Sequence, residues 1–243
     1  GTTCLRLTNT LAAPSGANQY RTKLHSISRL DISGPGAAVT SKAGLVLDSD
    51  TAGMGPRASI DRVFIHGFPV LVDMQDQGYL ANFHDCEFYD ALIAYRQSSG
   101  SDAGENVRFS GANIIHSTDL AFHLIDNTSE VFFEGSIDYI KQLCVITGAP
   151  SRLFISGHVE PRGSNLVSDD GNYVVDGSGS DVRAVVSGKD SFIDIDGNGS
   201  LVVIDGWFDI NNSGGVAPYA YDHLVKVRHA NSKFILRGSA QNW

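Results

Sequence analysis

Two five-residue segments in the middle of the chain, Val131-Phe132-Phe133-Glu134-Gly135 and Leu153-Phe154-Ile155-Ser156-Gly157, carry the same pattern 22 residues apart. In both, apolar residues occupy the first and third positions, a polar residue the fourth and glycine the fifth. Alternation with a period of two places the first and third side chains on one face of a strand and the second and fourth on the other. The segments therefore predict two equivalent strands, each ending at a turn.

The same pattern recurs through most of the chain and defines a series of rows. The other copies are Leu30-Asp31-Ile32-Ser33-Gly34, Val63-Phe64-Ile65-His66-Gly67, Val107-Arg108-Phe109-Ser110-Gly111, Ala184-Val185-Val186-Ser187-Gly188, Val202-Val203-Ile204-Asp205-Gly206 and Phe234-Ile235-Leu236-Arg237-Gly238, with a weaker copy at His84-Asp85-Cys86-Glu87-Phe88. The central positions stand at 32, 65, 86, 109, 133, 155, 186, 204 and 236, so the four middle steps are 21, 23, 24 and 22 residues. A repeat of about 22 residues built from short strands is typical of a solenoid.

A right-handed parallel β-helix needs about this length per coil, for three short strands and three corners, with coils stacked about 4.8 Å apart. Further apolar segments follow the rows, as at Val70-Leu71-Val72 and Ala91-Leu92-Ile93, and supply the other strands. We therefore expect an all-β, right-handed, single-stranded parallel β-helix of about 8–10 coils. Residues 1–27 are expected to form an entry segment or first coil, residues 28–243 the β-helix, and residues 35–45, 160–183 and 211–221 its longer loops.

Two other folds use short repeats or many strands. Leucine-rich repeats share the period, but their Leu–Asn consensus is missing from this chain. An antiparallel β-sandwich needs hairpins, and Asp-Gly dipeptides such as Asp170-Gly171 and Asp176-Gly177 in the last third would allow one there. A sandwich does not explain the step near 22 residues.

Composition excludes several classes of function. The chain of 243 residues carries 18 Lys+Arg against 27 Asp+Glu, a formal net charge of −9, which argues against a surface that binds nucleic acid or anionic membrane. No apolar run is long enough for a transmembrane helix. Cys4, Cys86 and Cys144 fit no zinc pattern and are expected to be free, largely buried thiols. We expect no cofactor.

One segment resembles a metal motif. Residues 194–199, Asp-Ile-Asp-Gly-Asn-Gly, match the opening of an EF-hand calcium loop, and Asp205 stands at its twelfth position. The flanking segments are predicted strands and the twelfth ligand should be Glu, so a tight Asx-type turn is the better interpretation. We therefore expect no metal ligand set.

The Ile-Ser-Gly and Val-Ser-Gly strand ends, the polar coils and the acidic charge resemble the pectate-lyase-like β-helices, and most of all the central domain of bacteriophage tailspikes. The resemblance covers residues 28–243 and concerns pattern, not a signature motif. It implies a homotrimer on the virion tail, folded in the bacterial host cytoplasm, that binds a bacterial surface polysaccharide. Many members of the family cleave that polymer, and this chain is expected to be a fragment of a longer spike.

Carboxylates on the outer face of the rows are the first candidates for catalysis, because glycan hydrolysis needs one protonated and one ionised carboxyl across the scissile bond. The fourth row positions point outward and would form a single ladder: Ser33, His66, Glu87, Ser110, Glu134, Ser156, Ser187, Asp205 and Arg237. Glu87 and Glu134 would lie two coils, roughly 9.6 Å, apart. That spacing approaches the upper end of the range of about 6.5–9.5 Å for an inverting mechanism.

Other residues complete the expected site. His66 beside Glu87 is a candidate base, also for abstraction of a proton from a uronic acid, and Asp205 is a further carboxylate; Asp85, Asp138 and Asp209 are alternatives. Candidates for substrate binding are Tyr89, Trp207, Tyr219, Tyr221 and Arg237. The alternative interpretation is that the outward polar residues are solvated surface and that the aromatic residues pack at the corners.

The leading hypothesis is thus a tailspike β-helix that binds and depolymerises a capsule or O-antigen glycan, as hydrolase or lyase. Its alternatives are a non-catalytic glycan-binding or structural β-helix segment and a cellular polysaccharide lyase.

Overall fold

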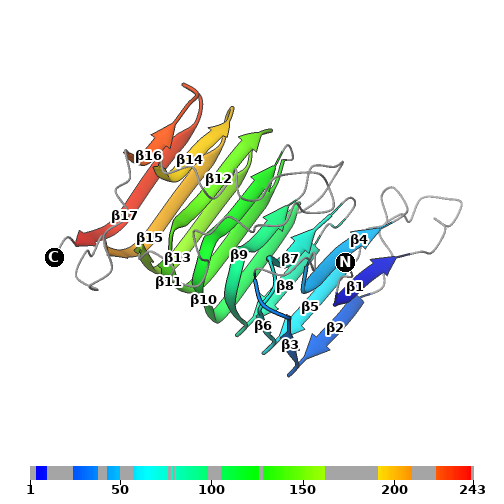
Figure 1. Cartoon of the computed structure of the whole chain (residues 1–243). Coiled ribbons are helices and arrows are strands. Elements are labelled where there is room, and N and C mark those ends of the chain that lie inside the picture. The colour runs from blue at the N-terminus through cyan, green and yellow to red at the C-terminus, as the bar shows by residue number, and fades with distance from the viewer. Residues whose placement is uncertain are drawn as a thin grey trace, which may run out of the picture.

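The computed structural model describes residues 4–9, 24–37, 43–49, 57–75, 78, 80–97, 105–125, 128–161, 191–209 and 223–241. These residues form seventeen strands in one sheet and contain no helix, so none that could cross a membrane. Every pairing between the described strands is parallel. The strands stack one beyond the next, with β1 near one end of the stack and β17 at the other (Figure 1).

The pairings fall into three ladders, and one passage of the chain through all three is called a coil. Ladder 1 joins β2 (Leu24–Ser28), β5 (Arg57–Asp61), β8 (Leu80–His84) and the first parts of β10 (Asn106–Ile125), β11 (Glu130–Ile140), β13 (Arg152–Pro161), β15 (Leu201–Asp209) and β17 (Lys233–Gln241). Ladder 2 joins β3 (Asp31–Ser33), β6 (Phe64–His66), the start of β9 (Glu87–Gln97), the middle of β10 and the last parts of β11, β13, β15 and β17.

Ladder 3 closes each coil. It joins β1 (Leu5–Asn9), β4 (Leu45–Ser49), β7 (Val70–Met74), the ends of β9 and β10, β12 (Gln142–Gly148), β14 (Ser191–Gly197) and β16 (His223–Val227). The prediction of an all-β chain with parallel strands is confirmed, and the arrangement is consistent with a β-solenoid. The antiparallel sandwich is excluded for the described part of the chain.

The core lies between the three ladders and is filled by every second side chain. Phe83, Phe109 and Phe133 occupy one inward position on successive strands of ladder 1 and are at most 2% exposed. The Phe83 and Phe109 rings stack at 4.6 Å, and Phe122 contacts Phe109 edge to face. Because neighbouring strands repeat in register, equivalent side chains form continuous apolar columns, and this stacking supplies the burial that no single coil could achieve alone.

The corner between ladders 1 and 2 requires an unusual backbone conformation. Gly135, Gly157, Gly206 and Gly238 occupy it in four consecutive coils, with φ between 120° and 148°. A Cβ on Gly157 would lie 1.9 Å from the carbonyl oxygen of Gly135, so the stacked corner excludes any side chain. The glycine that ends these rows is therefore required by the corner.

Earlier coils build the same corner differently, and this changes the assignment of the first three rows. There a left-handed residue (Arg29, Arg62 or Asp85) is followed by an extra residue. In the second and third coils this extra residue, Val63 or Cys86, is buried. It imitates an inward strand position, the first of its row in the case of Val63 and the third in the case of Cys86, so the rows at 30–34, 63–67 and 84–88 were expected to align with those at 107–111 and 131–135. That alignment is wrong: the rows at 30–34 and 63–67 pair in ladder 2, the row at 84–88 crosses the corner from ladder 1 into ladder 2, and the rows at 107–111 and 131–135 begin in ladder 1.

Some predictions fall outside the described residues. These are the row at 184–188, most of the expected loops at 160–183 and 211–221, and the middle of the loop at 35–45. Within residues 1–27, β1 pairs with β4 and β2 pairs with β5, and β2 runs across the expected boundary at residue 27.

Candidate functional site

The outer side chains of ladder 2 form a continuous row of ionisable and aromatic groups, called here the ladder-2 strip. Its central inward column, from Ile32 to Phe208, is buried, so the flanking positions face outward. The first outward column contains Asp31, Phe64, Glu87, Ile114, Ser136, His158 and Trp207, and the second contains Ser33, His66, Tyr89, His116, Asp138 and Glu160. Pairing in register thus brings together chemistry that is scattered along the sequence.

Three rings in the second column stack face to face. Tyr89 lies between His66, at 4.6 Å with an interplanar angle of 10°, and His116, at 5.0 Å and 1°. The rings occupy the same position on β6, β9 and β10, whose backbones are about 4.8 Å apart. The strand spacing matches the stacking distance, so the register alone holds the three rings parallel.

A carboxylate contacts each imidazole of this stack. Asp31 Oδ1 lies 3.1 Å from His66 Nε2, and Glu87 Oε1 lies 2.9 Å from His116 Nε2. If Glu87 accepts the Nε2–H bond, His116 carries its lone pair on Nδ1, which lies 3.4 Å from the Ser117 hydroxyl oxygen. A histidine oriented by a carboxylate is the usual arrangement for a general base.

The Tyr89 phenol remains protonated beside these groups. Desolvation raises its pKa, and the negative charges of Asp31, Asp90 and Glu87 raise it further. A neutral phenol can donate a hydrogen bond or a proton at neutral pH. His116 and Tyr89 therefore place an acceptor and a donor of protons next to each other on the outer surface.

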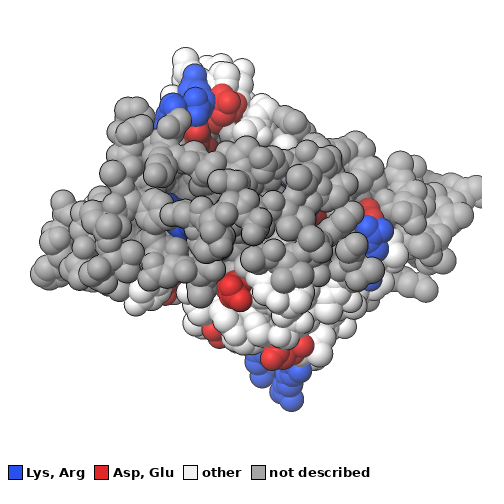
Figure 2. Space-filling view, in the orientation of Figure 1, with Lys and Arg blue, Asp and Glu red and all other residues white. Residues whose placement is uncertain are grey.

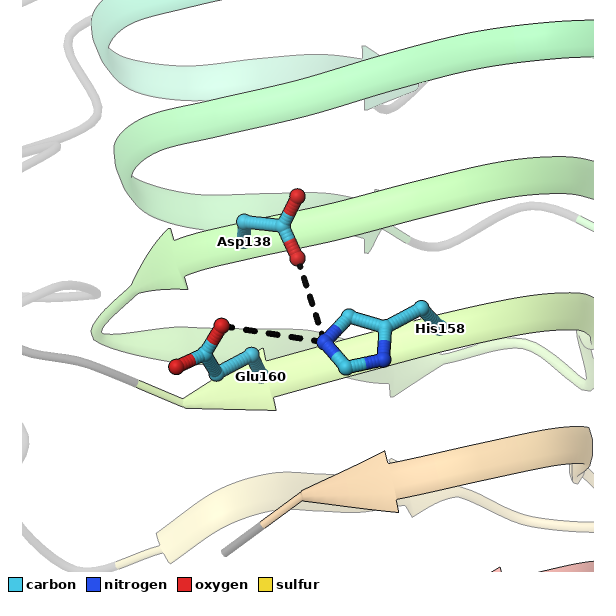
Figure 3. A group of neighbouring side chains, drawn as sticks. All are labelled: Asp138, His158 and Glu160. Atoms are coloured by element: carbon cyan, nitrogen blue, oxygen red, sulfur yellow. Dashed lines mark ion pairs between the residues drawn. The ribbon is translucent and has the colours of Figure 1, made fainter. Parts of the chain in front are cut away.

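A second cluster lies further along the strip (Figure 3). His158 Nε2 stands 3.4 Å from Asp138 Oδ1 and 3.7 Å from Glu160 Oε2. Asp138 comes from β11, whereas His158 and Glu160 come from the same face of β13. Trp207, opposite His158 on β15, is 44% exposed and offers a ring surface beside the cluster.

The expected Glu87–Glu134 couple does not exist as predicted. Glu87 lies in ladder 2, opposite Phe64 and Ile114, whereas Glu134 lies in ladder 1, opposite Ser156. The single ladder from which their spacing was derived is therefore wrong, because the two residues lie in different ladders. Glu134 instead accepts a hydrogen bond from the backbone N–H of Gly111 at 3.1 Å.

The other expected residues divide between the two ladders. His66, Tyr89 and Trp207 lie on the ladder-2 strip, but the carboxylate that contacts His66 is Asp31, while Glu87 contacts His116. Asp205 and Arg237 are exposed and face each other across neighbouring strands of ladder 1. Tyr219, Tyr221 and the side chain of Asp209 lie outside the described residues.

Sequence reasoning assigned no role to His116, His158 or Glu160, and named Asp138 only as an alternative. The signal that could have found them is the second apolar alternation in each coil. Ile115, Ile137 and Val159 are buried, and the residues that follow them are His116, Asp138 and Glu160. Aligning these second strands on their own would have shown the column.

Two carboxylates of the calcium-like segment 194–199 contact basic side chains of the following coil. Arg228 donates two hydrogen bonds to Asp194, at 2.8 and 2.5 Å, and His229 lies 3.2 Å from Asp196. Residues 191–197 form strand β14 and a turn follows at residues 198–199, so the expected turn occupies only the end of the segment. These carboxylates therefore serve to join β14 to the coil that follows.

All three cysteines are free, as predicted, and Cys86 and Cys144 are buried while Cys4 is exposed. Burial raises the pKa of both buried thiols, which keeps them protonated and unreactive at neutral pH.

On the face of the molecule in Figure 2, the described Lys and Arg lie in small groups beside Asp and Glu.

Comparison with known proteins found no matching family model, no matching curated protein and no matching solved structure.

Proposed function

We propose that the chain is a right-handed, single-stranded parallel β-helix of the tailspike kind, with about eight coils in its described part. The parallel ladders support this architecture, since crossovers between parallel strands are right-handed in nearly all proteins. In this proposal the ladder-2 strip binds a bacterial surface polysaccharide and cleaves it, on the virion tail.

The shape of the strip supports a polymeric ligand. From Asp31 to Trp207 it crosses six strand spacings, roughly 29 Å at about 4.8 Å each. That length accommodates several units of an extended chain. Carboxylates and imidazoles can hydrogen-bond hydroxyl groups along it, and the exposed Trp207 ring can stack on a sugar.

The charge of the strip favours a neutral or amino-sugar polymer. Asp31, Glu87, Asp138 and Glu160 supply four carboxylates along it. A polyuronate would meet like charge over the whole length, whereas hydroxyl and ammonium groups would meet acceptors. The preferred substrate is therefore a glycan without uronic acid.

The observation that carries the cleavage proposal is the contact between His116 and Glu87 beside Tyr89. His116 accepts a proton from the water that attacks the anomeric carbon, and Glu87 fixes the orientation of His116. Tyr89 donates a proton to the departing glycosidic oxygen and regains one from His116, so the C–O bond to water replaces the C–O bond to the leaving sugar. General acid–base catalysis of this kind contributes about 10²–10⁴-fold to a rate.

The test is incubation with capsular polysaccharides and O-antigens of three classes: neutral, amino-sugar and uronic. New reducing ends report cleavage, and ultraviolet absorbance of an unsaturated product separates elimination from hydrolysis. We expect His116→Ala and Glu87→Gln each to lower the rate about 100-fold or more. The matched control is Glu130→Gln, a half-buried glutamate on ladder 1 that pairs with Arg152; it should retain the rate.

The alternatives predict other results. A non-catalytic β-helix would bind one of the polymers and release no reducing ends. If Glu134→Gln abolishes cleavage while Glu87→Gln and His116→Ala do not, the active site lies on ladder 1 and the proposal for the ladder-2 strip is wrong.

A further inference from the structure

We propose that Asp138, His158 and Glu160 form a binding site for one first-row divalent transition-metal ion, such as Zn²⁺, Mn²⁺ or Co²⁺. Within the described residues this is the one group of three potential ligands whose donor atoms all lie within 4.8 Å of one another. The inference stands on this geometry and does not need the proposed function.

The separations between the donor atoms fit coordination better than hydrogen bonding. An N–H···O hydrogen bond has its most frequent length near 2.9–3.0 Å. The separations from His158 Nε2 to Asp138 Oδ1 and Glu160 Oε2 are 3.4 and 3.7 Å. Ligand atoms about 2.0–2.1 Å from a tetrahedral ion lie roughly 3.3 Å apart. Small side-chain rotations would therefore place an ion at the centre of the three atoms.

The backbone holds the three side chains in place. His158 and Glu160 are two residues apart on β13 and so share a face, and Asp138 lies directly opposite Glu160 on β11. Ser136 donates a hydrogen bond of 2.7 Å to Asp138 Oδ2, which leaves Oδ1 directed at His158. A hydrogen bond to the carboxylate oxygen that does not bind the metal is the usual way in which a protein orients a metal-binding carboxylate.

The mixture of ligands selects the class of ion. One imidazole with two carboxylates suits Zn²⁺, Mn²⁺ or Co²⁺, whereas Ca²⁺ and Mg²⁺ prefer oxygen ligands alone. Three protein ligands leave at least one coordination position for water or for an oxygen of a bound molecule. Asp138 and His158 are only half-buried, so this position faces the outer surface of the strip.

A second histidine provides a matched control because its surroundings look similar and yet differ in one respect. His84 Nδ1 lies 3.1 Å from Asp61 Oδ1 and 3.3 Å from Asp85 Oδ2. However, Asp61 also contacts Arg62 at 3.0 Å, and Asp85 accepts a hydrogen bond from the Ala112 backbone N–H at 2.8 Å. The donor atoms of this group do not all lie within 4.8 Å of one another, unlike those of Asp138, His158 and Glu160, so His84 with its neighbours should bind no transition metal.

The test is isothermal titration of the tag-free, chelator-treated protein with ZnCl₂, repeated with CoCl₂ while visible absorption is recorded. We expect one ion to bind per chain. Bound Co²⁺ should give the intense visible absorption of a four- or five-coordinate ion, and an equal concentration of CaCl₂ should not displace the bound ion. His158→Ala should weaken binding about 100-fold or more, whereas His84→Ala should leave it unchanged.

Asp138→Asn is the second variant, because it keeps the size of the side chain and tests the site even where His158→Ala fails to fold. It should lower the affinity for Zn²⁺ while the far-UV spectrum stays that of the wild type. Absence of a bound equivalent in the wild type, loss of binding in His84→Ala, or stronger binding of Ca²⁺ than of Zn²⁺ would each overturn the assignment. None of these readouts involves a polysaccharide.

Discussion

At the corner between ladders 1 and 2, single residues decide whether the coils can stack. Gly157 has φ 139°, and a Cβ there would collide with the Gly135 carbonyl oxygen at 1.9 Å. We predict that Gly157→Ala lowers the free energy of unfolding by about 3 kcal/mol, from backbone strain and steric overlap together. Urea unfolding followed by circular dichroism measures this.

Gly199 is the control for the steric part of that effect. Its φ is 82°, but a Cβ there would meet only Pro150 Cβ at 3.5 Å, an ordinary contact. Gly199→Ala should therefore cost only the strain of a left-handed residue, about 1 kcal/mol. Equal losses in the two variants would contradict the close approach of the stacked corners.

A single buried histidine, His123, makes the folded chain less stable as the pH becomes acidic. Burial lowers the pKa of His123 to about 3, and the neighbouring Arg96 guanidinium lowers it too, against the opposing charge of Asp73. The unfolded chain binds this proton below about pH 6.5, whereas the folded chain does not until about pH 3. The contribution of His123 to the free energy of unfolding is therefore fully present above about pH 6.5 and is lost as the pH falls towards about 3.

We predict that His123→Leu removes this dependence. Relative to the variant, the wild type should lose up to about 1.4 kcal/mol per pH unit between about pH 6.5 and 3. Unfolding midpoints in urea at a series of pH values give the comparison. Parallel pH curves for the two proteins would show that His123 is not buried in its neutral form.

At the scale of the element, one corner of β10 depends on an asparagine. Asn113 is fully buried, accepts a hydrogen bond from the Cys86 backbone N–H at 3.0 Å and donates to the carbonyl oxygens of Ser110, at 2.8 Å, and Glu134, at 3.3 Å. Asn113→Ala leaves the buried Cys86 N–H without its acceptor and removes a donor from each of the two carbonyl oxygens. We predict a loss of about 3 kcal/mol in the free energy of unfolding.

The exposed Asn82 on β8 is the control for this element. It accepts one hydrogen bond, from the Ser110 hydroxyl at 3.3 Å, and water can replace it. Asn82→Ala should change the free energy of unfolding by less than about 0.5 kcal/mol. The same urea titrations compare both variants, and similar losses would contradict the role of Asn113.

The sequence predicts strands better than it predicts which strands are neighbours. Alternation placed Ile65 and Phe109 inward, and both are buried. The alignment of the first rows failed because Val63 and Cys86 are buried corner residues, and an apolar corner residue looks like an inward position of a strand. The local alternation predicts which face of a strand a side chain occupies. Which strands are neighbours depends on the number of residues in each corner.

The same limit applies to the candidate site. Glu87 and Tyr89 were found because they stand in or beside a row, but His116 follows a second alternation that lacks a terminal glycine. The contact between His158 and Asp138 joins residues on two strands. Only the register of β11 with β13 brings them together, and that register is not written in any local motif.

At the scale of the whole molecule, ladder 1 carries apolar side chains on its outer face. Phe132 and Phe154 stack there at 4.9 Å, half-buried, with Ile235 in the same column. We predict that this column contacts other copies and that light scattering gives three times the mass of the chain. Phe154→Ser should shift the mass towards that of the single chain, whereas Val227→Ser on ladder 3 should not. A single-chain mass for the wild type would contradict the trimer.

Binding and cleavage of a polysaccharide on the ladder-2 strip would be visible in a structure of the complex. The most direct measurement is a crystal structure of the assembled Glu87→Gln variant with a fragment of a polymer that the wild type cleaves. We expect sugar units along ladder 2, with one glycosidic bond within hydrogen-bonding distance of His116 and Tyr89. Sugar bound at Glu134 and Asp205 on ladder 1, with the ladder-2 strip empty, would contradict it.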